Sequence, residues 1–225
     1  SVFDGLRLTN FELYYMKKTL FAIILFSNLI FSQIKFDQYF ENKTLRLDYY
    51  HTGNSVEDSY SIDELIEEPY WGGSKLNLLD KFDYGKYKFI VKDSESGKEI
   101  YSRTYATLFS EWQTTDEAKQ TTKSFSETIV FPYPKNPVTL EFYSRDKKNV
   151  LHKKFEYVVN PNGYFIKTER TLEYKNFEVL NSDNPDEAVD IVIIPDGYTE
   201  DEMDKFNKDC EKFTGFLFNA SPYKE

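Results

Sequence analysis

Thr44-Leu45-Arg46-Leu47-Asp48-Tyr49-Tyr50-His51 is the stretch that decides the fold. Apolar side chains occupy every second position from Leu45 to Tyr49, and Arg46 and Asp48 lie between them. Successive side chains of an extended chain point to opposite faces, so this alternation predicts a β-strand with one buried face and one solvated face.

The same alternation recurs along the chain as far as about Phe165. It predicts further strands over residues 86–93, 99–105, 128–131, 138–143 and 150–159. The polar residues 93–97 join two of these strands as a hairpin turn, and residues 145–149 join another two. One buried and one wet face in each strand is typical of an antiparallel sandwich, so we expect a mainly β fold.

Beyond residue 180 the pattern changes. Residues 181–187 are polar and contain a proline, which indicates a linker, and residues 189–194 are almost continuously apolar, which predicts a strand buried on both faces. Thr199 and Glu202 have the spacing of a capping box, so a helix is expected to begin there. Its apolar stripe contains Met203, Phe206, Cys210, Phe213 and Leu217. We expect this strand, turn and helix to open a second domain that is truncated at Glu225.

The first 32 residues have the composition of a targeting segment. Lys17 and Lys18 follow Met16, a short apolar run ends at Phe31, and polar sequence begins after Ser32. This order predicts a secretory signal peptide over residues 16–32. The run is too short for a bilayer, which needs about 20 residues, so we expect no membrane attachment after its removal. Residues 1–15 are interpreted as translated upstream sequence, and the protein as secreted or periplasmic.

Composition narrows the possible chemistry. The chain has 225 residues, with 28 Lys and Arg against 38 Asp and Glu, for a net charge of −10. Such a chain would be repelled by phosphate backbones, so we expect no nucleic-acid partner. Two His and one Cys cannot form a complete His/Cys metal site. An aromatic content of 18% is enough to build a core without disulfides.

Three blocks carry a resemblance to a known family. They are residues 46–53, residues 101–118 and residues 190–199. Here the chain resembles the IgA-peptidase-type secreted zinc metallopeptidases, in their N-terminal domain and the opening of their peptidase domain. The resemblance implies a β-sandwich over residues 33–175, a linker over 176–188 and the start of a zincin-like α/β domain over 189–225. The family has Gly where Thr104 stands and a small residue where Pro195 stands.

The resemblance also implies a zinc site that this sequence lacks. The family's His-Glu-x-x-His helix binds zinc through its two His and uses the Glu as general base. Neither His51 nor His152 has a second His within a helical turn. We therefore expect no catalytic residue, no metal ligand and no cofactor in this chain, with zinc only in a full-length relative. Its own missing peptidase domain, and a protein substrate, are the expected partners.

Four residues are candidates for a cleft or an interaction surface. Asp196 and Tyr198 follow the apolar run, where loops often face an active site, although a local capping role also explains them. Trp112 and Glu111 could mark an interaction surface, although core packing is the usual role of a Trp.

The remaining reactive side chains have simpler interpretations. His51 is expected to be a structural or surface residue, His152 a surface residue, and Cys210 a buried, unreactive thiol. The acidic residues between positions 183 and 190 could gather around calcium, but a solvated linker fits their composition better.

Three functions are compatible with these residues. The first is the N-terminal, non-catalytic portion of an exported zinc metalloendopeptidase, which supports the peptidase domain or presents protein substrate. The alternative is a stand-alone secreted sandwich that binds glycan or protein through its many aromatic side chains. The third is a gene product that does not accumulate, because an unpaired strand favours aggregation.

Overall fold

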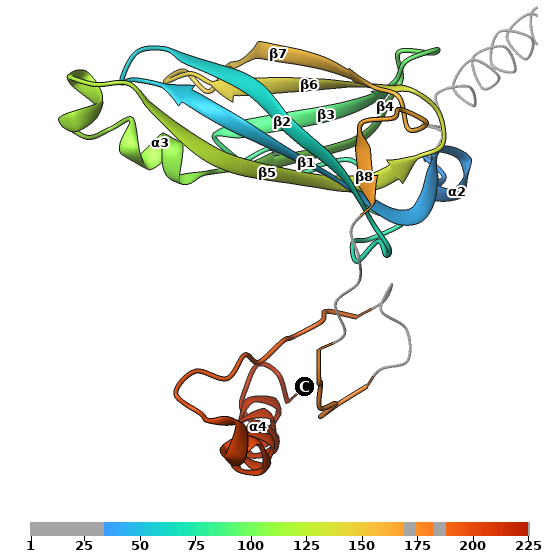
Figure 1. Cartoon of the computed structure of the whole chain (residues 1–225), viewed down its shortest axis with the longest axis vertical. Helices are drawn as coiled ribbons and strands as arrows, with labels where there is room; N and C mark the ends of the chain where they lie inside the picture. Colours follow the sequence, from blue (N-terminus) through green and yellow to red (C-terminus); the bar gives the residue numbers. More distant parts are fainter. Residues whose placement is uncertain (1–33, 169–173, 182–187, 225) are drawn as a thin grey trace, which may run out of the picture. The chain divides into compact units, whose positions relative to one another are not determined.

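The computed structural model describes residues 34–168, 174–181 and 188–224 (Figure 1). The predicted signal peptide, residues 1–15 and residues 182–187 of the predicted linker lie outside these residues. None of the helices described is both long enough and apolar enough to cross a membrane.

Two four-stranded sheets make up the main body of the described chain (Figure 1). The first has the order β5 (Lys123–Pro134), β1 (Phe40–Gly53), β2 (Asp58–Glu68), β8 (Ile166–Thr168). The second has the order β4 (Glu99–Tyr105), β3 (Tyr87–Asp93), β6 (Val138–Arg145), β7 (Leu151–Val159). Neighbouring strands are antiparallel, except that β2 and β8 are parallel.

Aromatic side chains join the two sheets face to face. Tyr49 on β1 lies edge-on to Phe142 on β6, with ring centroids 5.3 Å apart. Phe89 on β3 lies 6.3 Å from Phe131 on β5. All four side chains are buried. The predicted mainly β, sandwich-like fold is confirmed.

The alternating stretch from Thr44 to His51 lies within β1. Leu45, Leu47 and Tyr49 are buried, and the side chains between them are more exposed. The predicted hairpin turn after β3 also forms, because Asp93 accepts hydrogen bonds from the backbone N–H groups of Ser96 and Gly97. Gly97 has φ +69°, a conformation that glycine adopts without steric cost.

Strand β2 escaped the sequence analysis. Buried and exposed residues do not alternate regularly along β2, and acidic residues separate its apolar ones. The sequence therefore lacks the regular alternation that predicts a strand. Two of these carboxylates pair with cations on β1: Glu67 lies 2.8 Å from Lys43 and Glu68 lies 2.9 Å from Arg46. Strand β2 is hydrogen-bonded to β1 along its whole length. This pairing makes the segment a strand although its sequence alternates only weakly. Strand β8 and the short helices α2 (Phe36–Tyr39) and α3 (Leu108–Trp112) were also not predicted.

The strand predicted over residues 189–194 is not formed. Val189 is 88% exposed, and Val192 and Ile194 are each 79% exposed. A strand buried on both faces needs hydrogen-bonded neighbours at its edges, and no strand within the described residues pairs with this segment.

The predicted helix does form. Thr199 and Glu202 make the capping box, a 3₁₀ turn covers Glu200–Glu202, and α4 covers Met203–Phe218. Cys210 is buried and unpaired, as expected, but Phe213 of the predicted stripe is exposed.

Candidate functional site

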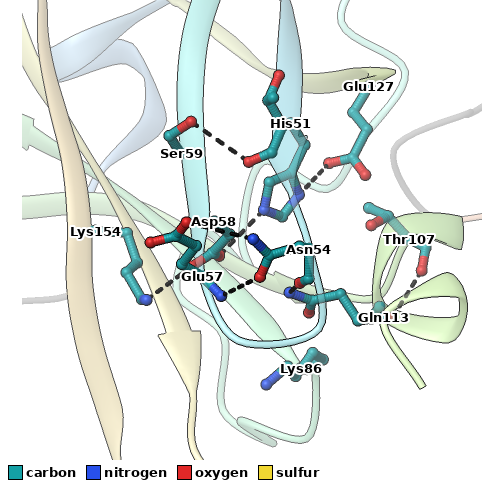
Figure 2. Close-up of polar contacts among 12 residues, drawn as sticks. His51, Asn54, Glu57, Asp58, Ser59, Lys86, Thr107, Gln113, Glu127 and Lys154 are labelled. Carbon is teal, nitrogen blue, oxygen red and sulfur yellow. Dashed lines mark hydrogen bonds and ion pairs between the residues drawn. The ribbon is translucent and has the colours of Figure 1, made fainter. Parts of the chain in front are cut away.

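His51 is the centre of a polar network inside the sandwich (Figure 2). Its side chain is 0% exposed. Nδ1 lies 3.1 Å from Glu127 Oε2, and Nε2 lies 3.2 Å from Asp58 Oδ2. A carboxylate oxygen only accepts hydrogen bonds, so both ring nitrogens donate only when the imidazole is protonated. The two carboxylates therefore favour the imidazolium form of His51, in which both ring nitrogens donate.

The ionisation of the three groups is coupled. Burial lowers the pKa of His51, but its hydrogen bonds to Asp58 and Glu127 outweigh burial and raise the pKa above its ordinary value. Burial raises the pKa of Asp58, but hydrogen bonds from His51 and Lys154 outweigh it and lower the pKa to about 2. The pKa of Glu127 is lowered by the same balance, in which the His51 hydrogen bond is the main favourable contribution.

Two further contacts connect this network to both sheets. Lys154 Nζ on β7 lies 2.7 Å from Asp58 Oδ1 on β2. The Tyr49 hydroxyl on β1 donates to Glu127 Oε2 on β5 at 2.7 Å, and it lies 3.0 Å from the Tyr105 hydroxyl on β4. The two sheets are thus joined by charged side chains as well as by the aromatic core. We call His51, Asp58, Glu127 and Lys154 the charge cluster.

Aromatic rings enclose the imidazolium. Phe109 of α3 stacks on it with ring centroids 3.8 Å apart, Tyr60 of β2 stacks on it at 4.3 Å, and Tyr87 of β3 lies edge-on at 5.1 Å. Aromatic faces attract cations, so the stacked rings of Phe109 and Tyr60 stabilise the protonated imidazole, and all three rings exclude solvent from it.

The loop from β1 to β2 places His51 and Asp58 opposite each other. Asn54 Oδ1 accepts hydrogen bonds from the backbone N–H groups of Val56 and Glu57, which closes the turn. Gly53 is required by close approach, because a Cβ there would lie 2.2 Å from the Glu57 carbonyl oxygen.

The second block of the resemblance contacts this loop directly after the first block ends (Figure 2). Gln113 Nε2 donates to the Asn54 carbonyl at 2.9 Å, and the Ser55 N–H donates to the Ala118 carbonyl at 2.9 Å. The block over residues 101–118 also contains Phe109, whose ring stacks on His51 of the block over residues 46–53.

Sequence reasoning did not single out Asp58 or Glu127. Glu127 had a detectable signal, since it occupies a core-facing position between Phe125 and Ile129 on an alternating strand. A charged residue at such a position needs a buried partner. Asp58 had no comparable signal, because it lies at the start of a strand that was not predicted.

Trp112 and Glu111, two of the four candidate residues, belong to α3. Trp112 is buried, packs 5.7 Å from Phe109 and 5.3 Å from Phe125, and donates through Nε1 to Glu117 at 2.8 Å. Glu111 is exposed. The structure therefore places Trp112 in the core, and Glu111 on the surface beside it.

Asp196 and Tyr198, the other two candidates, precede α4. Asp196 is exposed, whereas the Tyr198 hydroxyl donates to Asp209 at 3.0 Å and its ring lies 5.1 Å from Phe206. These contacts are local to the helix start, and a cleft-facing role for the two residues stays a prediction.

The described residues do not fit a zinc ion. No group of three or more His, Cys, Asp and Glu side chains among them is arranged as a metal site. Both nitrogens of His51 already face carboxylates, and His152 is exposed and lies 2.9 Å from Asp146. Neither His is placed with further ligands that would complete a tetrahedral site.

Thr104, where the resemblance predicts Gly, makes two hydrogen bonds. Its backbone N–H and its hydroxyl each donate to Asp80 Oδ2 at 2.6 Å. Asp80 Oδ1 also accepts from the backbone N–H groups of Phe82 and Asp83. Burial raises the pKa of Asp80, but these hydrogen bonds lower it further than burial raises it. The carboxylate thereby fixes the long loop between β2 and β3 to strand β4.

The fold and the charge cluster define a β-sandwich domain in which the buried carboxylates of Asp58 and Glu127 pair with His51. Family models identify it: the model for the peptidase M64 N-terminus matches residues 35–156, and the model for IgA peptidase M64 matches residues 177–225. The chain belongs to the peptidase M64 family. No curated protein matches it.

Proposed function

We propose that the sandwich is a non-catalytic domain of an exported zinc metalloendopeptidase, where it supports the peptidase domain or presents protein substrate. The observation that carries this proposal is the order of the two family matches on one chain, with the N-terminal match on the sandwich. Zinc and the catalytic base would belong to the peptidase domain and to none of the described residues.

The charge cluster supports a structural role for the sandwich. Both ring nitrogens of His51 already lie within hydrogen-bond distance of a carboxylate, so neither is free to take a proton from a substrate. Its burial also keeps substrate away from both ring nitrogens. The cluster instead joins the two sheets through the ion pair between Lys154 and Asp58. A rigid sandwich of this kind suits a domain that supports a neighbouring domain.

The apolar segment before α4 supports the assignment of a peptidase partner. Val189, Val192 and Ile194 are exposed within the described residues. Apolar surface of this kind favours burial, at about 25 cal/mol per Å² removed from water. Packing of this segment inside a peptidase domain would supply that burial.

The test compares two forms of a protein that carries the sandwich together with a complete peptidase domain, one with residues 33–175 and one without them. If the sandwich supports the peptidase domain, its removal lowers cleavage of short peptides and of proteins alike, together with the thermal midpoint of the peptidase domain. If it presents substrate, cleavage of proteins falls and cleavage of short peptides is unchanged. The absence of a His-Glu-x-x-His motif from the gene beyond codon 225 would contradict the proposal.

Export can be tested separately. Residues 16–32 fused to a reporter enzyme should direct it out of the cytoplasm, and mass spectrometry of the mature N-terminus should show cleavage after Ser32. A reporter retained with its N-terminus intact would contradict export. Lys17→Glu with Lys18→Glu is the matched control, because the positive n-region is needed for secretion.

A second candidate function, glycan or protein binding by the sandwich itself, is favoured by the loop between β2 and β3. Phe82 and Tyr84 are 76% and 86% exposed, and their rings lie 6.1 Å apart, nearly parallel. Because Asp80 fixes this loop, the two rings are presented without a large entropic cost of ordering. A glycan array and a pull-down with the whole chain and with Phe82→Ala/Tyr84→Ala would test it. Binding that persists in the double variant would exclude these rings as the site.

A further inference from the structure

Four lysines gather around the short helix α2 at one end of the sandwich. Lys35 immediately precedes the helix, and Lys75 Nζ lies 5.8 Å from the centre of one of its aromatic rings. Lys98 Nζ lies 5.7 Å from the centre of another, and Lys135 Nζ donates to a backbone carbonyl of the helix. These four residues come from separate parts of the sequence and meet only in the folded sandwich. We call them the α2 lysine patch.

The α2 lysine patch carries positive charge that the described carboxylates do not balance. Every lysine on a strand of the sandwich forms an ion pair with a carboxylate. In contrast, the ion pairs of the described residues include none with Lys35, Lys98 or Lys135. Helix α2 contributes one acidic residue, Asp37. The α2 end of the sandwich therefore presents a positive surface on a chain whose net charge is −10.

The opposite charge lies in the part of the chain that follows the sandwich. Residues 169–225 contain 6 Lys and Arg against 15 Asp and Glu, a net charge of 6 − 15 = −9. Four of these carboxylates stand together where helix α4 begins, and all four residues are exposed: Glu200, Asp201, Glu202 and Asp204. We call residues 200–204 the acidic run. Opposite charges on two surfaces steer their encounter and fix how they associate.

The chain leaves the sandwich at the same end as the α2 lysine patch (Figure 1). Strand β8 ends at Thr168, which pairs with Glu67 of β2. Glu67 forms an ion pair with Lys43, close to the start of β1, and β1 follows α2 directly. Residues 169–199 therefore tether the acidic run to this end of the sandwich. Tethering makes the encounter of patch and run intramolecular, so weak charge pairs are sufficient to hold them.

We infer that the α2 lysine patch docks the acidic run of the same chain and so holds the opening of the peptidase region against the sandwich. Exposed ion pairs are individually weak, so the docking depends on several of them together. Salt screens it, because the Debye length falls from about 10 Å at 0.1 M to about 3 Å at 1 M. The inference rests on the proposed supporting role for its purpose, but the docking itself is measured on a chain without peptidase activity.

Zero-length carbodiimide cross-linking, which joins a lysine amine to a carboxylate in direct contact, tests the docking on the whole chain. Peptide mass spectrometry at low salt should show links from Lys35, Lys98 or Lys135 to residues 200–204, and about 1 M salt should remove them. The matched control lysines are 147 and 148, since both are exposed in the turn from β6 to β7 at the opposite end of the sandwich. Links that are absent from the patch, or equally frequent from the control lysines, would overturn the inference. In a mixture of ¹⁴N and ¹⁵N chains, links found only between copies would also overturn docking within one chain.

A charge swap provides a second test, read out as the radius of gyration by small-angle X-ray scattering. Lys98→Glu/Lys135→Glu should expand the chain at low salt to the value that the natural chain reaches at high salt. Adding Glu200→Lys/Asp201→Lys to that variant should restore the compact value, which a variant that had lost its fold would not regain. Reversing the two control lysines should leave the salt response of the natural chain unchanged. A natural chain whose radius does not change with salt would overturn the docking. The supporting role would still stand if removal of residues 33–175 destabilised the peptidase domain.

Discussion

His51 shows how a single buried residue obtains its charge from its surroundings. An isolated buried imidazole would be neutral, because burial disfavours the charged form. Here two carboxylates, Asp58 and Glu127, each accept a hydrogen bond from the ring, and their joint effect exceeds that of burial. The three groups therefore act as one unit, and removing any of them changes the other two.

Replacement of His51 is expected to be strongly destabilising. His51→Gln leaves two buried carboxylates without the positive charge between them, which should lower the free energy of unfolding by about 3–5 kcal/mol. Urea denaturation of the two proteins measures this loss. His152→Gln is the matched control, since that exposed residue pairs with Asp146 at the surface and should cost at most about 1 kcal/mol. Equal effects of the two substitutions would contradict the assigned charge cluster.

The cluster also predicts how stability depends on pH. The folded-state pKa of His51 is raised, so its contribution is complete below the unfolded value of about 6.5 and is lost as pH rises through the folded value. The pKa values of Asp58 and Glu127 are lowered, so their contribution is present above their unfolded values of about 4 and is lost as pH falls.

The thermal midpoint of the natural chain should therefore be highest between about pH 4.5 and 6.5. In His51→Gln the decline on the alkaline side of this range should be absent. An NMR titration gives the direct check, since the His51 ring should titrate above 6.5. A value at or below 6.5 would show that the imidazole is not paired as described.

At the scale of elements, the β1–β2 hairpin aligns the cluster. His51 and Asp58 are only seven residues apart, and the turn between them brings their side chains together across the strand pair. The turn depends on Gly53, where a side chain would collide with the Glu57 carbonyl and approach Phe109. Backbone packing at one glycine thus governs the geometry of a charged group two residues away.

Gly53→Ala should lower the free energy of unfolding by about 1–3 kcal/mol, the usual cost of forcing extra atoms into a packed site. Guanidinium unfolding followed by tryptophan fluorescence measures the change, because Trp112 packs in the same region. Gly72→Ala, where an added Cβ meets nothing within 4 Å, should unfold like the natural chain. An unchanged free energy of unfolding in Gly53→Ala would mean that the turn accommodates the extra methyl group at little cost.

At the scale of the whole molecule, the two described parts differ in how they satisfy their apolar residues. The sandwich buries large side chains between its sheets, whereas residues 189–194 remain exposed. Exposed β-branched sequence is prone to pair with another chain. This difference predicts that association of the chain with itself originates in the segment before α4.

Val192→Glu/Ile194→Glu should therefore shift the chain toward monomer. Sedimentation velocity over a range of protein concentrations is the appropriate measurement. Val56→Glu, at an exposed valine in the β1–β2 turn, should leave self-association unchanged. If the control variant dissociates the chain as effectively as the double variant, the association surface lies on the sandwich.

The sequence by itself determined the features that depend on near neighbours. Alternation over a few residues predicted β1, β3 and β4, and the Thr199–Glu202 spacing predicted the start of the C-terminal helix. These patterns are visible because a strand repeats every two residues and a helix cap involves positions three apart.

Only the tertiary structure decided the role of His51 and the existence of β2. The bond from His51 to Glu127 joins positions 76 residues apart, and it depends on the register of β1 against β5. Likewise, β2 is a strand because β1 pairs with it, whereas residues 189–194 have the stronger local pattern and no described partner. A strand is completed by hydrogen bonds to another strand, so its formation depends on the neighbours that the fold brings to it.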